Sequence, residues 1–207
     1  LADVDGVVIR TANLNSKILS HCKNLKIVSR HGVGYDNVDS NYLFKNKIAL
    51  AITGTSNAVS VSEHVMTMFL YLTKKINLSN KLVKSGNFNK KSELPDFFEL
   101  YNKNILILGF GRIGQELAKR CLGFDMKVFV YDPFVENDII FNKNCNPINK
   151  KEGLKVADYL SVHMPLNDKT KNFITYEDFN IVRKNLILVN TARGGIINEN
   201  ALLDAVK

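Results

Sequence analysis

The glycine-rich segment Gly109-Phe110-Gly111-Arg112-Ile113-Gly114 is the feature that most constrains the fold of this chain. It follows a predicted strand at Asn104–Leu108 and precedes a helical pattern over Gln115–Cys121. In such a strand–turn–helix unit the first glycine allows a tight turn, the second lets the backbone approach a phosphate, and the third lets the helix pack on the strand. The start of the helix then attracts an anion. Alone, the segment is also compatible with an ordinary tight turn.

An acidic residue downstream makes the pattern more specific. The next apolar run, Lys127–Tyr131, ends in Asp132, which lies 18 residues after Gly114. Dinucleotide-binding folds place at this point a carboxylate that accepts hydrogen bonds from the ribose hydroxyls. Such a carboxylate repels the 2′-phosphate of NADP, so the sequence predicts an NAD site. Asp132 can also serve as a turn residue before Pro133.

Short β-rich runs alternate with helical patterns along the whole chain, which indicates an α/β fold with a parallel sheet. Strands are predicted at Val4–Ile9, Lys26–Ser29 and Ile48–Ile52. From Ser60 the spacing becomes helical, and the apolar residues predicted to share one face are Val61, Val65, Met68, Phe69 and Leu72. We expect the polar stretch from Asn77 to Leu94 to be a connection.

Composition excludes several classes of protein. Apolar residues make up 45% of the 207 residues and charged residues 23%, which is ordinary globular usage. The apolar runs are too short to span a bilayer, so we expect no membrane association. The cysteines Cys22, Cys121 and Cys145 lie far apart and lack CxxC spacing. They predict neither disulfides nor a metal site, and they favour a reducing, cytoplasmic location.

The net charge of +8 raises the question of nucleic-acid binding. Such binding needs basic residues gathered on one face. Here the lysines are scattered through polar segments such as Lys81–Lys91 and Asn142–Lys151. We therefore expect no nucleic-acid partner, and a mild attraction of anionic substrates instead.

Three further segments point to one family. They are His31-Gly32-Val33-Gly34-Tyr35-Asp36-Asn37-Val38-Asp39, Ser161-Val162-His163-Met164-Pro165-Leu166, and Val189-Asn190-Thr191-Ala192-Arg193-Gly194-Gly195-Ile196-Ile197-Asn198-Glu199. With the glycine-rich segment, they make the chain resemble the D-isomer-specific 2-hydroxyacid dehydrogenases. The resemblance runs from about Val4 to Lys207.

The resemblance implies a Rossmann-type parallel-sheet cofactor domain plus a partial flavodoxin-like substrate domain. Residues 1–59 would be the last part of the substrate domain, and residues 60–207 an NAD-binding domain truncated at its C-terminal end. Because the chain opens at Leu1 and stops at Lys207 within a helical pattern, we expect it to be a fragment. The long helix from Ser60 resembles the family's dimer-forming region, which implies a homodimer.

The implied activity is that of an NAD-dependent dehydrogenase interconverting a D-2-hydroxy acid and a 2-oxo acid. The family's active-site arginine falls on Arg193, whose guanidinium can hold a carboxylate bidentately and polarise the reacting carbonyl. Thr191 and Ala192 would lie along the nicotinamide. Met164 and Pro165 would lie near the adenosine side of the cofactor, and Thr170 would also bind the cofactor. The diphosphate residues would be Gly109, Gly111, Arg112, Ile113 and Gly114, and the ribose residue Asp132.

The substrate side is less determined. Val33 and Gly34 would offer backbone N–H groups to the substrate carboxylate, although this segment is equally a tight strand-to-helix turn. The segments Val8-Ile9-Arg10-Thr11-Ala12 and Ser29-Arg30-His31-Gly32 resemble the D-3-phosphoglycerate dehydrogenase-like branch of the family, in which such arginines face an acidic substrate tail. Alternatively, Arg10 and Arg30 are surface residues at strand ends. A 3-phosphoglycerate, hydroxypyruvate or glyoxylate type of substrate is compatible with these residues.

The family's acid/base histidine and its partner glutamate have no counterpart among these residues, and His163 is interpreted as a residue lining the cofactor pocket. Two alternatives to an enzyme stay open. One is an NAD-sensing, corepressor-like binding protein of the same fold. The other is a catalytically incomplete fragment.

Overall fold

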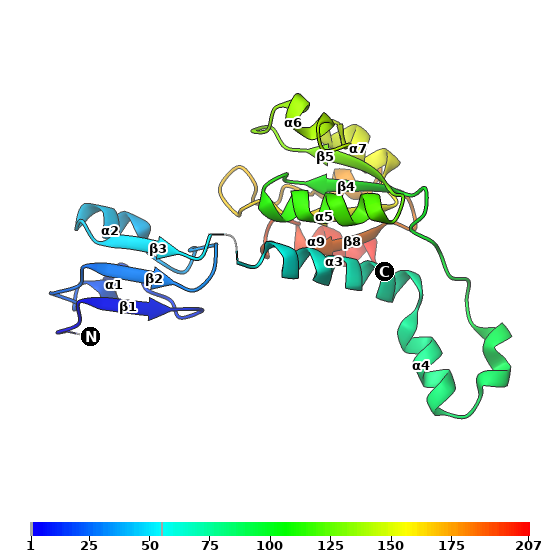
Figure 1. The fold of residues 1–207 in the computed structure, drawn as a ribbon, viewed down its shortest axis with the longest axis horizontal. Helices are drawn as coiled ribbons and strands as arrows, with labels where there is room; N and C mark the ends of the chain where they lie inside the picture. The colour runs from blue at the N-terminus through cyan, green and yellow to red at the C-terminus, as the bar shows by residue number, and fades with distance from the viewer. Residues whose placement is uncertain (1, 55) are drawn as a thin grey trace. The chain divides into compact units, whose positions relative to one another are not determined.

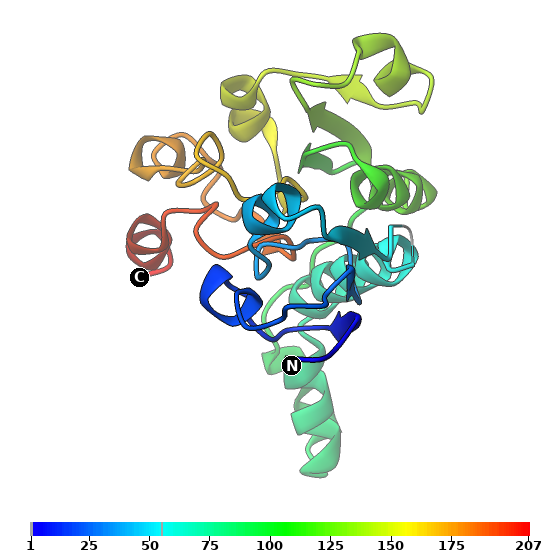
Figure 2. The same ribbon diagram turned by 90° about the vertical axis from the view of Figure 1, so that its left-hand side faces the viewer.

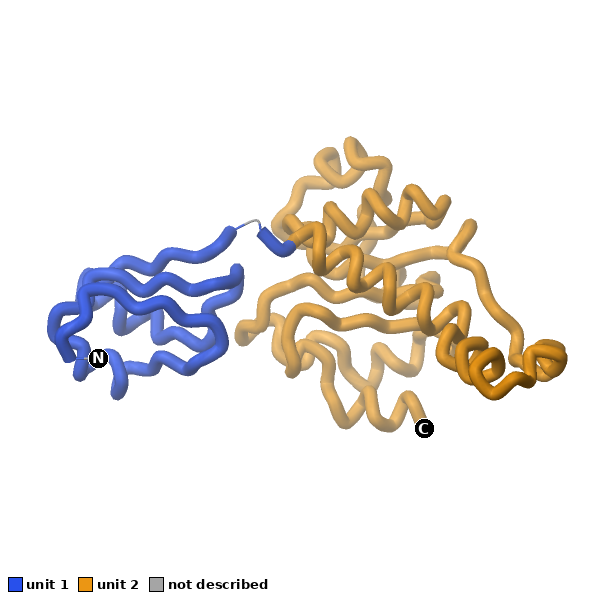
Figure 3. Tube along the Cα trace, turned by 60° about the horizontal axis from the view of Figure 1, so that its bottom comes forward, with its two compact units in different colours: residues 1–57 blue, residues 58–207 orange. Residues whose placement is uncertain are grey.

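A computed structural model describes residues 2–54 and 56–207. The chain divides into two compact units, residues 1–57 and residues 58–207 (Figure 3). Among the described residues, a three-stranded parallel sheet of order β1-β2-β3 forms the first unit, and a five-stranded parallel sheet of order β6-β5-β4-β7-β8 forms the second. The parallel α/β architecture predicted from the sequence is confirmed.

The first unit buries one face of its sheet. Its strands and helices are β1 (Gly6–Ile9), α1 (Ser16–Leu19), β2 (Ile27–Arg30), α2 (Ser40–Lys45) and β3 (Ala49–Ile52). Val28 of β2 is fully buried in a cluster with Leu19 and Leu43 from the two helices. Residues of the opposite face are open, and Val8 is 80% exposed. Because Ile9 pairs with Arg30, the segments that follow β1 and β2 leave the sheet at the same edge.

The second unit contains the remaining elements. Its strands are β4 (Asn104–Leu108), β5 (Lys127–Tyr131), β6 (Asn146–Pro147), β7 (Tyr159–Val162) and β8 (Ile187–Asn190). Its helices are α3 (Ala58–Thr73), α4 (Ile76–Lys84), the 3-10 helix η1 (Phe88–Glu93), α5 (Arg112–Gly123), α6 (Asn137–Phe141), α7 (Lys150–Val156), α8 (Tyr176–Phe179) and α9 (Glu199–Ala205).

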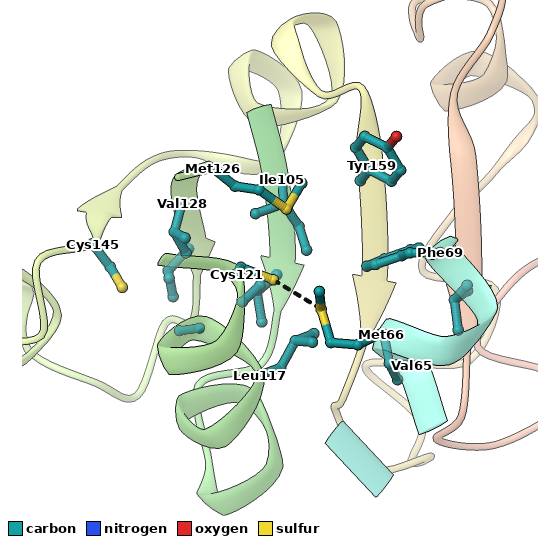
Figure 4. Close-up of a cluster of buried hydrophobic side chains, with 14 of the residues drawn as sticks. Val65, Met66, Phe69, Ile105, Leu117, Cys121, Met126, Val128, Cys145 and Tyr159 are labelled. Atoms are coloured by element: carbon teal, nitrogen blue, oxygen red, sulfur yellow. Dashed lines mark hydrogen bonds between the residues drawn. The ribbon is translucent and has the colours of Figure 1, made fainter. Parts of the chain in front are cut away.

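Helices cover both faces of the five-stranded sheet, which is why residues 105–108 of β4 form an uninterrupted apolar run. Ile105 and Ile107 of β4 pack in one core cluster with residues of α3 and α5. Figure 4 shows this cluster, in which the Sγ of Cys121 lies 3.7 Å from the Sδ of Met66. The alternate residues Leu106 and Leu108 belong to the second cluster, on the other face, with Leu154 of α7.

Helix α3 differs in part from its predicted face. Val65 and Phe69 are fully buried, and the ring of Phe69 meets that of Tyr159 edge-on at 5.1 Å. Met68 and Leu72, predicted on the same face, are 36% and 49% exposed. The helix buries Ser62, Met66 and Thr73 instead. Met66 contacts Cys121 of α5, and the Thr73 hydroxyl forms a 3.0 Å hydrogen bond with that of Tyr159 in β7.

The polar stretch predicted as a connection forms α4 and η1. The spacing of Leu78 to Leu82 and of Ile76 to Val83 is helical, but no residue of α4 is buried. Both views show α4 projecting from the body of the second unit (Figures 1 and 2). Lysine and asparagine obscured the apolar positions, which is why the sequence suggested a loop.

Across the residues that the structure describes, no helix is long and apolar enough to cross a membrane.

Candidate functional site

The strand order of the second unit places a crevice at the carboxyl ends of β4 and β7. From β4 the chain moves outward to β5 and β6, and it then returns to the other side of β4 for β7 and β8. In open α/β sheets, ligands bind where the strand order reverses in this way. Gly109 follows β4 at this point, and His163 follows β7, with the His163 N–H donating to the carbonyl of Leu108 over 2.8 Å.

The three glycines of the predicted turn have different roles in this crevice. Gly109 has φ +96°, and a Cβ there would lie 2.9 Å from the carbonyl carbon of His163. A Cβ on Gly114 would collide with the carbonyl oxygen of Gly109, so a side chain here would separate α5 from the turn. A Cβ on Gly111 would meet nothing within 4 Å. The first and third glycines are thus required by the fold, whereas the second faces open space.

Helix α5 begins directly after this turn. Gly111 is its N-cap residue, and Arg112, Ile113 and Gly114 form its first turn. The positive end of the helix dipole therefore lies beside the open space at Gly111. This arrangement is able to hold a diphosphate.

Asp132 lies at the end of β5 and contacts the turn itself. Its Oδ2 accepts a hydrogen bond from the backbone N–H of Phe110 over 2.7 Å, and its Oδ1 accepts from the N–H of Phe134 over 2.9 Å. The carbonyl of Phe110 accepts from Nε2 of Gln115 over 3.0 Å. Phe110, whose ring is fully buried, is thus held at both backbone polar atoms. A carboxylate oxygen has a second lone pair, so Asp132 can still accept from a ribose hydroxyl.

A cavity of about 350 Å³ opens at this edge of the sheet. It brings together six of the predicted cofactor residues, which are Gly109, Gly111, Asp132, Met164, Pro165 and Thr170. The hydroxyl of Thr170 donates to the carbonyl of Pro165 over 2.6 Å and accepts from the N–H of Asn167 over 2.8 Å. These bonds fix the loop that forms one wall.

The cavity also has an aromatic wall, which was not predicted from the sequence. Tyr131, Phe134 and Phe173 also line it, and the rings of Tyr131 and Phe173 lie 5.7 Å apart. The ammonium group of Lys150 lies 4.6 Å from the centre of the Phe173 ring and donates to the Phe173 carbonyl over 2.6 Å. Tyr131 could have been predicted to line the cavity, because it directly precedes Asp132 in the sequence. Phe173 carried none, because its place depends on distant contacts.

His163 also lines the cavity, as the sequence suggested. Its Nε2 forms a 2.8 Å hydrogen bond with the hydroxyl of Ser161, and its Nδ1 is buried without a hydrogen-bond partner among the described residues. Burial lowers the pKa of His163 to about 4. The ring is therefore neutral at physiological pH and is a poor proton donor.

The segment with Arg193 follows β8. Because Asn190 pairs with Val162 in the sheet, Thr191, Ala192 and Arg193 leave the same edge as the loop with Met164. The hydroxyl of Thr191 is buried without a hydrogen-bond partner among the described residues. These three residues do not line the cavity, so they belong to a neighbouring part of the crevice edge.

The predicted substrate residues of the first unit share one edge of its sheet. Arg10 follows β1 and is exposed, and Arg30 ends the neighbouring strand β2. Arg30 folds back over Gly32 and donates from Nη1 to the carbonyl of His31 over 2.8 Å. Val33 and Gly34 are half-buried in the turn that follows. The structure therefore places Arg10, Arg30 and this turn at one edge of the sheet.

Comparison with known proteins identifies the family. The family model described as "D-isomer specific 2-hydroxyacid dehydrogenase, NAD binding domain" matches residues 66–207. The chain belongs to the D-isomer specific 2-hydroxyacid dehydrogenase family. Its second unit is the Rossmann-like NAD-binding domain of this family.

Individual relatives agree with this assignment. The chain is 36% identical over 204 residues to D-3-phosphoglycerate dehydrogenase of Bacillus subtilis, covering 98% of this chain and 38% of that protein. It is 35% identical over 217 residues to hydroxypyruvate reductase of Thermotoga maritima, covering 100% of this chain and 66% of that protein. The chain thus spans about two fifths to two thirds of the length of these relatives.

Among solved structures, D-lactate dehydrogenase from Aquifex aeolicus, complexed with NAD and lactic acid, superimposes with a TM-score of 0.91. It is 31% identical, and the match covers 100% of this chain and 62% of that one. The residues found here fit NAD on their own geometry. Gly111 leaves room for a diphosphate, a carboxylate stands beside the cavity, and the cavity wall is aromatic.

Proposed function

We propose that this chain is part of an NAD-dependent oxidoreductase that interconverts a D-2-hydroxy acid and a 2-oxo acid. The observation that carries the proposal is the position of Arg193 at the carboxyl end of β8, on the same sheet edge as the glycine turn. An arginine there can hold an acid substrate next to the dinucleotide. The relatives named D-3-phosphoglycerate dehydrogenase and hydroxypyruvate reductase support this reading.

In this proposal, residues 60–207 hold the cofactor. The backbone of Gly109, Gly111, Arg112, Ile113 and Gly114 binds the diphosphate, and the Asp132 carboxylate accepts from the adenosine ribose. Met164, Pro165 and Thr170 contact the adenosine side, and Thr191 and Ala192 lie along the nicotinamide. Bound NAD supplies hydride exchange with carbon 2 of the substrate.

Residues 1–59 contribute part of a flavodoxin-like substrate domain. The N–H groups of Val33 and Gly34 bind the substrate carboxylate, and Arg10 and Arg30 neutralise a distal acidic group such as a phosphate. Support comes from the shared sheet edge of these residues and from the net charge of +8.

The proton step needs a group that titrates near neutral pH. Since the pKa of His163 is about 4, this histidine serves as a neutral wall of the cofactor pocket. The acid/base histidine and the glutamate expected from the family have no counterpart among these residues. Arg193 then holds the substrate carboxylate and polarises the carbonyl that receives the hydride.

We also propose a homodimer formed through α3 and α4. The outer side of these helices exposes apolar residues that nothing in the unit covers, namely Met68, Tyr71, Leu72, Ile76 and Val83. Several large apolar side chains exposed on neighbouring helices are typical of a protein interface. A cytoplasmic location is supported by the three cysteines, which are free and buried.

The activity is tested with the intact protein and NADH on glyoxylate, hydroxypyruvate, pyruvate and 3-phosphohydroxypyruvate, by following absorbance at 340 nm. Turnover of at least one 2-oxo acid is expected, and D-stereochemistry of the product is checked by chiral chromatography. A protein that binds NADH but reduces none of these acids would instead be a binding protein.

A further inference from the structure

Asn190, the last residue of β8, bonds to the backbone of the segment that carries Arg193. Its Oδ1 accepts a hydrogen bond from the N–H of Ala192 over 3.0 Å. Its Nδ2 donates to the carbonyl of Arg193 over 2.8 Å. One half-buried amide group therefore fixes two successive residues of the segment to the end of the strand.

The far side of the same segment is fixed separately. Gly195 has φ +78°, and its carbonyl accepts from the N–H of Asn172 over 2.7 Å. The next carbonyl, that of Ile196, accepts from the N–H of Ile174 over 3.2 Å. Asn190 thus fixes the beginning of a short loop, residues 191–195, whose end is fixed by these backbone hydrogen bonds.

The chemistry of this anchor requires an amide. A carboxamide offers an acceptor and a donor on one planar group, and both are used here. An aspartate has the same shape but lacks the donor, so it would place a carboxylate oxygen against the carbonyl oxygen of Arg193. An alanine would leave both backbone groups without their side-chain partner.

The guanidinium of Arg193 depends on this backbone. Its Nη1 donates to the carbonyl of Ala192 over 2.8 Å, so the side chain lies back along the segment that Asn190 holds. A shift of the Ala192–Arg193 peptide would therefore move the guanidinium with it.

We propose that Asn190 is a positioning residue, which sets the orientation of Arg193 toward the substrate through these two hydrogen bonds. The inference rests on the proposed role of Arg193 in holding the acid substrate. It assigns to Asn190 no contact with substrate or cofactor.

The test uses the intact protein with Asn190→Ala and Asn190→Asp. The matched control is Asn149→Ala, because Asn149 also accepts from a backbone N–H, that of Glu152 at 2.9 Å, and donates to a Glu152 side-chain oxygen at 2.6 Å. Asn149 lies at the start of α7, away from β8. Both Asn190 variants should lower kcat/KM for the 2-oxo acid about 10–100-fold, because small misplacements of a positioning group have effects of this size. The Asn149 variant should keep the wild-type value.

Two further measurements separate positioning from general damage. In an Arg193→Ala background, Asn190→Ala should change kcat/KM less than about twofold, since residues that act together are not additive. Without NADH or substrate, amide hydrogen exchange of residues 191–195 should be faster in Asn190→Ala than in wild type and Asn149→Ala. The dissociation constant for NADH should change less than about threefold, because only Thr191 and Ala192 of the proposed cofactor residues lie in this segment.

The outcomes distinguish the two proposals. Wild-type protein that reduces no 2-oxo acid overturns the proposed function. Active wild-type protein whose Asn190→Ala loss is equally large with and without Arg193 overturns the positioning role. Unchanged exchange of residues 191–195 in Asn190→Ala overturns it as well.

Discussion

The carboxylate of Asp132 accepts a hydrogen bond from the backbone N–H of Phe110 over 2.7 Å. The residue expected to recognise the adenosine ribose thus also holds the turn expected to bind the diphosphate. The side-chain amide of Gln115 donates to the backbone carbonyl of the same residue, Phe110. Ribose recognition and the shape of the phosphate-binding turn therefore depend on one side chain.

This double role changes the expected effect of replacing Asp132. Asp132→Ser should raise the affinity for NADPH relative to NADH, because the charge that repels the 2′-phosphate is removed. It should also lower the affinity for NADH itself, about 5–100-fold, because the Phe110 N–H loses its acceptor. Fluorescence titration with both dinucleotides measures the two effects. Asp138→Ser, at an exposed position in α6, is the control, and an unchanged NADPH-to-NADH ratio would contradict the ribose contact.

The glycines provide a test of where the cofactor lies. Alanine at Gly111 or at Gly123 meets nothing within 4 Å, so neither change should lower the melting temperature. Gly111→Ala should nevertheless weaken NADH binding roughly tenfold or more, because its methyl group occupies the space of the diphosphate. Gly123→Ala, at the end of α5, should bind NADH as wild type does. Equal binding by both variants would place the diphosphate elsewhere.

Arg193 is expected to act on the substrate and not on the cofactor. Arg193→Ala should lower kcat/KM for the 2-oxo acid roughly 10²–10³-fold, the effect of removing a donor that stabilises developing charge. Arg193→Lys should restore little, because an ammonium cannot bind a carboxylate bidentately. Arg183→Ala serves as control, since Arg183 pairs with Asp158 near the opposite end of β8. A large loss of NADH affinity in Arg193→Ala would argue against this assignment.

Burial of His163 predicts how stability varies with pH. Its pKa is about 4 in the folded protein and about 6.5 when unfolded, so the unfolded chain binds more protons between these values. The stabilisation is complete above pH 6.5 and is lost as the pH falls toward 4, with about 2 kcal/mol gone at pH 5. Urea unfolding at pH 7.5 and 5 in wild type and His163→Gln measures this. The variant should lose less stability between the two pH values, and equal losses would refute the assignment.

The proposed dimer predicts a change in mass. Leu72→Glu places a charge on the exposed apolar side of α3 and should convert the dimer to monomer in sedimentation experiments at micromolar concentration. Phe124→Glu is the control, because Phe124 is similarly exposed (44% against 49%) but follows α5. A wild-type protein that sediments as a monomer would exclude the dimer directly.

Local sequence patterns predicted the parts of this fold that depend on neighbouring residues. The strand before Gly109, the helix after Gly114 and the acidic end of β5 all follow from short-range rules. The hydrogen bond from Phe110 to Asp132 could not be predicted, since it joins residues 22 positions apart that follow two different strands. The exposed side of α3 was misjudged because Met68 and Leu72 are as apolar as the residues that pack in the core. Phe173 lines the cavity and contacts Lys150, which lies 23 positions away in the sequence, and no rule of local spacing predicts such a contact.

The parallel order of the second sheet also separates two kinds of loop. The segment that follows each strand lies at the edge with the glycine turn, Asp132, Met164 and Arg193. The segments that precede the strands lie at the opposite edge. The exposed turn at Lys184 and Asn185, just before β8, belongs to that opposite edge. A reporter peptide or affinity tag inserted there would leave every strand-to-site connection at its native length. That turn is therefore a suitable insertion point for labelling the protein.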